Sequence, residues 1–150
     1  MNKITLIFLL ISLLSTNTFS QSVEFEKYTL KNGLNVILHQ DNSAPVVTTS
    51  VMYHIGAKDE SSDKTGFAHF FEHLLFEGTK NIQRGQWREI VNSNGGFFNA
   101  NTTADRTYYY SIFPSNNLEL SLWLESERML HPIINQVGVD TQKEVVKEEK

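Results

Sequence analysis

Hydrophobic and polar residues alternate over positions 23–30, and positions 34–38 are again mostly apolar. Such alternation is typical of a half-buried strand, because successive side chains of a strand point to opposite faces. Asn32-Gly33 lies between the two segments and is a strong signal for a two-residue hairpin turn. Positions 46–54 are rich in Val and Thr and predict a third strand.

The hydrophobic period then becomes helical. A helix is predicted to begin near Thr65, a plausible N-cap, and to end before Gly78, a plausible C′ glycine. The remaining predicted elements are, in order, a helix over 86–92, strands over 97–102 and 107–113 around a tight turn, a helix over 117–130, and a charged helix from 140 onward. Helices mixed with hairpin-connected strands favour an α+β fold, with a largely antiparallel sheet packed against helices, over a doubly wound parallel sheet.

The first twenty residues differ in character from the remainder. A basic start at Lys3 precedes an apolar run over 4–14, and the small residues Thr18 and Ser20 fit the cleavage positions before Gln21. This pattern predicts a secretory signal peptide over 1–20. A stable membrane anchor is not expected, because a spanning helix needs about 20 apolar residues. We therefore expect an exported protein, periplasmic or extracellular, in which 21–150 form the N-terminal part of a domain that continues beyond 150.

Composition narrows the function further. The formal net charge is −4, whereas proteins that bind polyanions are usually basic. A nucleic-acid partner is therefore not expected. The chain contains no cysteine, although an exported protein could use disulfides. Stability must therefore come from the core or from a bound metal.

The segment over 66–79 carries the candidate chemistry. Five apolar residues recur at helical spacing and predict one buried face: Phe67, Phe70, Phe71, Leu74 and Leu75. His69, Glu72 and His73 fall together on the opposite side, because residues three and four apart are neighbours on a helix.

Two imidazoles at i and i+4 can chelate one zinc ion, and catalytic zinc sites use three protein ligands with a fourth position left for water. Glu72, beside His69 and His73, fits a general base that takes the proton of that water. The order His-x-x-Glu-His is the pattern of the inverted zinc peptidases. The alternative is a surface helix with two chance histidines.

The charged C-terminal helix offers a third ligand in Glu144, Glu148 or Glu149. A solvated charged face is the alternative for all three. Glu149 follows Val145 by four residues and Val146 by three, so it shares their expected buried face. A carboxylate on an apolar face needs a partner, which a metal would supply. Glu149 is therefore favoured over Glu148.

The stretch 28–150 resembles the pitrilysin family, which includes insulin-degrading enzyme and the mitochondrial processing peptidases. Six landmarks in the family's order carry the resemblance, namely Leu30-Lys31-Asn32-Gly33-Leu34, Gly56-Ala57-Lys58-Asp59-Glu60, the 66–79 segment, Gly95-Gly96-Phe97-Phe98-Asn99-Ala100, Thr107-Tyr108-Tyr109-Tyr110 and Glu144-Val145-Val146-Lys147-Glu148-Glu149. The resemblance implies one Zn²⁺ per site, held by His69, His73 and Glu149, with Glu72 as general base.

The resemblance also implies a substrate contact and a partner. Asn99 and Ala100 match the edge strand that pairs with the substrate backbone, although Asn99 is equally well explained as a strand-end residue. The family often carries a second acidic residue seven positions before the third ligand, where this chain has Gln142. Active members close two homologous halves around a chamber, so a second half or subunit is expected, and this segment alone need not be active.

Three functions follow from these features. The first is a zinc endopeptidase acting on peptides or unfolded proteins. The second is a non-catalytic subunit of the same fold, which the intact set of His69, Glu72 and His73 argues against. The third is an exported metal-binding protein without hydrolytic activity, which predicts a closed site with four ligands, whereas only three good ligands are visible.

Overall fold

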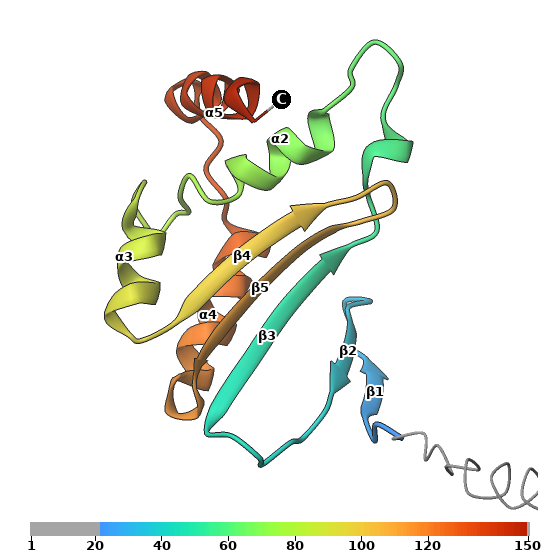
Figure 1. The fold of residues 1–150 in the computed structure, drawn as a ribbon, viewed down its shortest axis with the longest axis vertical. Helices are drawn as coiled ribbons and strands as arrows, with labels where there is room; N and C mark the ends of the chain where they lie inside the picture. Colours follow the sequence, from blue (N-terminus) through green and yellow to red (C-terminus); the bar gives the residue numbers. More distant parts are fainter. Residues whose placement is uncertain (1–21, 150) are drawn as a thin grey trace, which may run out of the picture. The chain divides into compact units, whose positions relative to one another are not determined.

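The computed structural model describes residues 22–149 (Figure 1). Its main elements are β1 (Glu26–Thr29), β2 (Asn35–Leu38), β3 (Val46–Tyr53), α2 (Phe67–Leu74), α3 (Gln86–Ser93), β4 (Phe97–Thr102), β5 (Thr107–Pro114), α4 (Leu118–Leu130) and α5 (Gln136–Glu148), with single 3₁₀ turns at Ala57–Asp59 and Ser115–Asn117. The predicted α+β class is confirmed. The predicted signal peptide lies outside the described residues and stays a prediction. Within 22–149, no helix combines the length and apolar character that crossing a membrane requires.

The chain divides into two compact units, one ending at Ser43 and the other beginning at Ala44. The first contains the antiparallel hairpin β1–β2, as the alternation predicts. Its turn spans three residues, 31–33, rather than the expected two, because the Leu30 N–H donates to the Leu34 carbonyl at 2.8 Å. Gly33 supplies the left-handed conformation that this longer turn needs, with φ of 89°.

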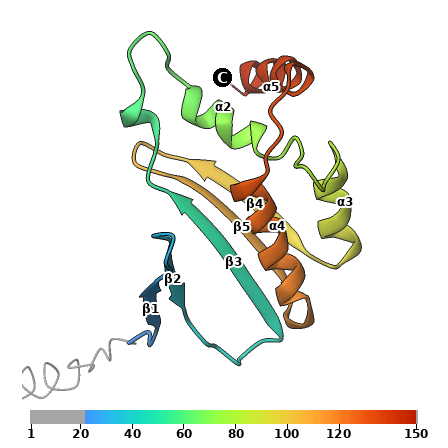
Figure 2. The ribbon, with the colours of Figure 1, turned by 180° about the vertical axis from the view of Figure 1, so that it is seen from behind.

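The second unit is built on an antiparallel sheet with the order β3-β5-β4. Alternate residues of the central strand β5 are buried, namely Thr107, Tyr109, Ser111 and Phe113. Helix α4 lies against this face, behind the sheet in Figure 1 and in front of it in Figure 2. Small side chains permit the close approach, because Ser121 of α4 lies 3.2 Å from Ser111 and 2.5 Å from Thr49, measured between hydroxyl oxygens. Helix α4 thus packs closely on the buried face of the sheet.

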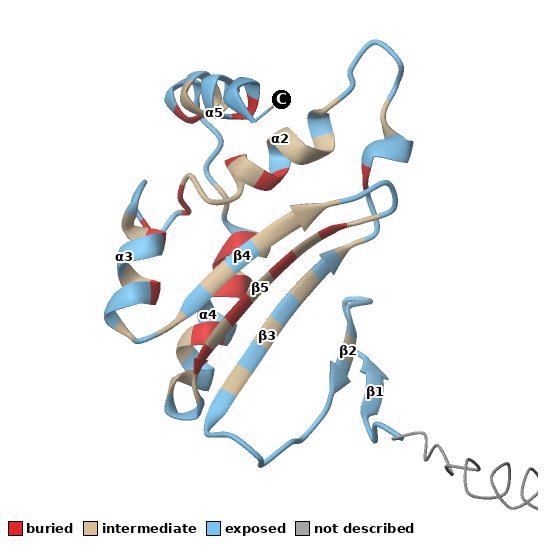
Figure 3. Ribbon diagram, in the orientation of Figure 1, coloured by how far each residue is buried: buried red, intermediate tan, exposed pale blue. Residues whose placement is uncertain are grey.

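The hydrophobic core lies between that sheet face and the helices, where Figure 3 shows buried residues concentrated on β5 and α4. Its buried members are Ile82, Trp87, Val91, Phe113 and Leu124. Gly96 enters β4 directly against Phe113, and a Cβ at that position would lie 2.4 Å from the ring. Glycine is therefore required there by the packing.

Two helix starts differ from the predictions. Helix α2 has Gly66, not Thr65, as its N-cap, because the Glu60 carboxylate accepts from the N–H groups of Gly66 and Ala68, each at 2.7 Å. A distant carboxylate thus replaces the local cap. Helix α5 begins at Gln136 rather than near 140, because the Asn135 side chain accepts from the Gly138 N–H and caps the helix four residues earlier.

Candidate metal centre

Three side chains from two helices converge where α2 and α5 pack together. His69 and His73 lie one turn apart on α2, and Glu149 follows the last residue of α5. The two histidine Nε2 atoms are 3.2 Å apart. Glu149 Oε2 lies 3.4 Å from Nε2 of His69 and 3.3 Å from Nε2 of His73. The structure therefore brings together the three residues that the sequence predicts as ligands.

This triangle of donor atoms fits a zinc ion. Zinc binds imidazole nitrogen and carboxylate oxygen at about 2.0–2.2 Å with tetrahedral geometry, which separates neighbouring donor atoms by about 3.3–3.5 Å. The observed edges of 3.2, 3.3 and 3.4 Å correspond to that spacing. Two imidazoles and one carboxylate also match the donor types of catalytic zinc sites. The spacing and the chemistry of the three donor groups therefore fit this metal.

The other two candidate carboxylates do not join the group. Glu144 pairs with Lys147 at 2.7 Å on the surface of α5, and Glu148 is exposed and outside the converging group. The expectation that Glu149 shares a buried face with Val145 and Val146 is wrong, because only Val146 is buried, whereas Val145 is 38% exposed and Glu149 is itself exposed. Glu149 is nevertheless the carboxylate that lies close to the two histidines.

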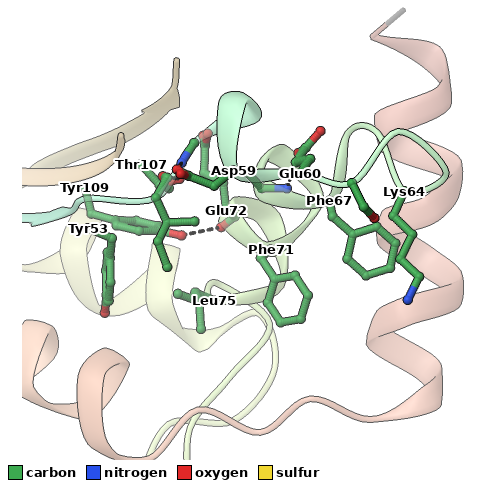
Figure 4. A pocket seen from close by; sticks show the side chains of 14 residues that line it. Tyr53, Asp59, Glu60, Lys64, Phe67, Phe71, Glu72, Leu75, Thr107 and Tyr109 are labelled. Atoms are coloured by element: carbon green, nitrogen blue, oxygen red, sulfur yellow. Dashed lines mark hydrogen bonds between the residues drawn. The ribbon is translucent and has the colours of Figure 1, made fainter. Parts of the chain in front are cut away.

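Glu72, on the same helix as the two histidines, is held by contacts with the sheet. Its side chain is buried, with 8% of the residue exposed. The Thr102 hydroxyl, at the end of β4, donates to Oε2 of Glu72 at 2.5 Å. The Tyr109 hydroxyl donates to the backbone carbonyl of Glu72 at 3.3 Å (Figure 4). Burial raises the pKa of Tyr109, so this hydroxyl stays protonated and remains a donor. Both contacts fix the carboxylate and its backbone on the sheet.

The burial of α2 differs from the amphipathic prediction. Phe67 and Phe71 were expected in the core but are 48% and 42% exposed, whereas Glu72 from the opposite side is buried. The helix rests on the sheet through Glu72 and Leu74 instead. The exposed rings line an apolar cavity of about 470 Å³ that Glu72 and Tyr109 also border (Figure 4).

A buried arginine supports the C-terminal end of α2. Arg128 of α4 is 1% exposed and donates through Nη1 to the Leu75 carbonyl at 3.2 Å. Its Nε donates to Glu125 at 3.0 Å. Its guanidinium lies 4.1–4.3 Å from three aromatic ring centres, those of Phe76, Trp87 and Tyr109. No sequence pattern marks Arg128, because its partners outside α4 come from three separate segments, at 75–76, 87 and 109.

A second set of contacts reaches the site from the side of α5. Nδ1 of His73 lies 3.1 Å from Oε1 of Gln142, and the Gln142 amide donates to Oε1 of Glu77 at 2.5 Å. Arg84 in turn pairs with Oε2 of Glu77. Gln142 was noted in the sequence only as a departure from an acidic residue, and its contacts with residues 65 or more positions away could not be anticipated.

Asn99 and Ala100 lie in β4, at the edge of the sheet, as expected. The Thr103 N–H donates to the Arg106 carbonyl, which makes this a hydrogen-bonded pair. Bonded and non-bonded pairs alternate along an antiparallel ladder, so the Ala100–Tyr109 pair is non-bonded and the Ala100 N–H points to the free edge. There it donates to the side-chain oxygen of Asn99 at 2.9 Å.

Comparison with known proteins places this arrangement in a family. The family model described as Insulinase (Peptidase family M16) matches residues 35–150. The chain belongs to peptidase family M16. The resemblance drawn from the six sequence landmarks is therefore confirmed.

Individual relatives within family M16 agree with this assignment. The chain is 37% identical over 126 residues to "Zinc protease PqqE" of Helicobacter pylori, an alignment that covers 83% of this chain and 28% of that protein. It is 31% identical over 139 residues to "Cytochrome b-c1 complex subunit 1, mitochondrial" of Homo sapiens, covering 90% and 29%. A crystal structure of a protease from Helicobacter pylori superposes with a TM-score of 0.81 at 36% identity, covering 85% of this chain and 31% of that one. The chain thus spans less than a third of the length of these relatives.

Proposed function

We propose that this M16 chain contributes the metal site of a zinc-dependent endopeptidase that hydrolyses peptides or unfolded polypeptides. The observation that carries the proposal is the triangle of His69, His73 and Glu149 donor atoms, with edges of 3.2–3.4 Å. The buried Glu72 lies on the same helix as the two histidines. The name of the Helicobacter pylori relative, a zinc protease, supports the choice of metal.

In this proposal His69, His73 and Glu149 hold one Zn²⁺. When bound, zinc lowers the pKa of a coordinated water to about 7 and polarises a carbonyl group. The group that converges within residues 22–149 has three ligands, which is the number that catalytic sites use when they leave a position for water.

Glu72 acts as the general base. It follows His69 by three residues on α2, a spacing at which side chains are neighbours on the helix surface. One oxygen, Oε2, is occupied by the Thr102 hydroxyl, which leaves Oε1 to accept a proton from water and pass it to the leaving amine. Thr102 prevents the carboxylate from rotating away, so the base is oriented before substrate arrives.

The edge strand β4 supplies the substrate contact. The outward N–H of Ala100 is positioned to pair with the backbone of an extended peptide, once the Asn99 side chain turns aside. Pairing of this kind uses main-chain groups and therefore gives affinity with little sequence selectivity. It suits a substrate that is a peptide or an unfolded chain.

A second homologous half or subunit completes the enzyme in this proposal. The relatives are more than three times as long as the matched segment, and one is named as a subunit of a larger complex. We also propose export through the signal peptide over 1–20. A non-catalytic subunit is the second candidate function, favoured by the name of the human relative, and a zinc-loaded full-length protein inert toward every peptide would support it.

The test is made on the full-length protein. Metal analysis should find one zinc per site, and Glu149→Gln should abolish stoichiometric zinc while Glu148→Gln, the matched change one residue away on the exposed surface, should not. Glu72→Gln should keep the metal and lose peptide cleavage. Absence of zinc in the wild-type protein, or cleavage retained by Glu72→Gln, would refute the respective assignment.

A further inference from the structure

The contacts of Gln142 determine more than the packing of α5. A primary amide has two chemically different ends, a carbonyl that accepts and an NH₂ group that donates. Glu77 faces one end and His73 the other, at 2.5 and 3.1 Å. The orientation of the Gln142 amide therefore decides the direction of its hydrogen bonds with Glu77 and His73.

Glu77 fixes the orientation of that amide. Its side chain is 9% exposed, and Oε2 is paired with Arg84, so it is a carboxylate that can only accept. The NH₂ group of Gln142 must consequently face Glu77, because the reversed amide would direct its carbonyl oxygen at a carboxylate oxygen. Gly138 permits the close approach of α5, since a Cβ there would lie 3.2 Å from the Glu77 side chain.

The carbonyl oxygen of Gln142 then faces Nδ1 of His73, where only an N–H can make a hydrogen bond. A neutral imidazole with its proton on Nδ1 has its lone pair on Nε2. Nε2 is the atom that lies 3.2 Å from His69 and 3.3 Å from Glu149. In the neutral ring, the bond therefore leaves the free lone pair on Nε2, one of the three donor atoms.

We infer that Gln142 is a positioning residue that, oriented by the Arg84–Glu77 pair, holds His73 in the Nδ1–H tautomer and keeps Nε2 ready to bind a metal ion. The inference rests on the proposed function for the identity of that metal, and the tautomer itself is a property of the metal-free protein. Outer hydrogen bonds of this kind typically change metal affinity by about 10–100-fold when removed.

The first experiment measures the tautomer without metal. Histidine ring ¹⁵N shifts in the metal-free full-length protein, at a pH where the ring is neutral, should show the proton of His73 on Nδ1. Gln142→Leu should redistribute the proton toward Nε2, whereas Gln136→Leu, the same change at an exposed position of α5, should leave the tautomer unaltered. The resonance of residue 73 is assigned by its loss in His73→Gln.

The second experiment tests the direction of the hydrogen bonds that join Glu77, Gln142 and His73. The double variant Glu77→Gln with Gln142→Glu exchanges the two side chains. The carboxylate at 142 then accepts from Nδ1 of His73, and the amide at 77 donates to that carboxylate. The exchange should therefore restore the Nδ1–H tautomer. Zinc affinity, measured by competition with a chelator, should fall about 10–100-fold in Gln142→Leu and recover in the exchanged pair. Glu77→Gln alone should give an intermediate result, because the Gln142 amide is then free to reverse.

The outcomes separate this inference from the proposed function. If Gln142→Leu leaves both the Nδ1–H tautomer and zinc affinity unchanged, the inference is overturned and the zinc peptidase proposal stands. If the wild-type protein binds no zinc but shows the tautomer dependence, the positioning role holds and the function fails. An Nε2–H tautomer in the wild-type, metal-free protein would overturn the inference directly.

Discussion

Arg128→Met tests whether the buried guanidinium is an essential support of the fold. The substitution keeps most of the side-chain volume but removes the partner of Glu125, which is 3% exposed. Oε1 of Glu125 has no hydrogen-bond partner within the described residues, so the carboxylate depends on the bond from Arg128 to Oε2. A buried carboxylate left without its cation costs about 3–5 kcal/mol.

Two further losses add to this cost. The guanidinium also lies over the rings of Phe76, Trp87 and Tyr109, and a desolvated cation–π contact contributes about 2 kcal/mol or more. The bond to the Leu75 carbonyl disappears as well. Since such terms are not additive, we expect a net loss of about 4–5 kcal/mol in the free energy of unfolding.

The assay is urea denaturation followed by tryptophan fluorescence, because Trp87 touches the substituted side chain. Arg88→Met is the matched control, since Arg88 is exposed and lies 5.3 Å from the Phe98 ring centre, and it should cost no more than about 1 kcal/mol. The double change Arg128→Met with Glu125→Met should recover most of the loss, because no buried charge remains. A single-variant loss below about 1 kcal/mol, or a double variant no better than the single one, would refute the reasoning.

Three further predictions concern the core, pH and the metal. Gly96→Ala should lower the free energy of unfolding by about 1–3 kcal/mol in urea denaturation, because the new Cβ would meet the Phe113 ring at 2.4 Å, and an unchanged midpoint would contradict that packing. Hydrogen bonds from Thr79 and Asn81 lower the pKa of Glu127 below 4.5, so its stabilising effect is present above the unfolded-state pKa and is lost as pH falls through the folded one. The free energy of unfolding should thus fall less steeply with decreasing pH in Glu127→Gln than in the wild type. Parallel pH dependences of the two proteins would exclude the effect. Free zinc at about 100 times its Kd should stabilise the folded state by about 2.7 kcal/mol, a shift that EDTA reverses; equal unfolding midpoints with and without zinc would count against the metal site.

The local pattern of the sequence was sufficient to predict the order of helices and strands and the relative positions of residues within one helix. The spacing of His69 and His73 placed both rings on one side of α2. Helical spacing and the family resemblance together favoured Glu149, the carboxylate that lies beside them. Strand β4 was also where the pattern placed it, whereas its position at the edge was implied by the family resemblance. The features predicted from the pattern itself depend on helix or strand periodicity, which the sequence contains directly.

What depended on distant segments could not be predicted. Periodicity shows which residues share a face, but not which face meets the sheet, so Glu72 is buried where Phe67 and Phe71 are exposed. The cap of α2 comes from Glu60, six residues before the first amide it binds. Arg128 was overlooked because a buried cation is recognised only by partners that the fold assembles.

The outward N–H of Ala100 also bears on pairing between the strand edges of separate chains. An exposed strand edge is a template for unwanted pairing between chains. Here the side chain of Asn99 already occupies that donor at 2.9 Å, so a passing strand gains nothing at this position until it displaces the amide. A single side chain thus lowers the tendency of this strand edge to pair with another strand, while the backbone N–H remains available once the side chain moves away.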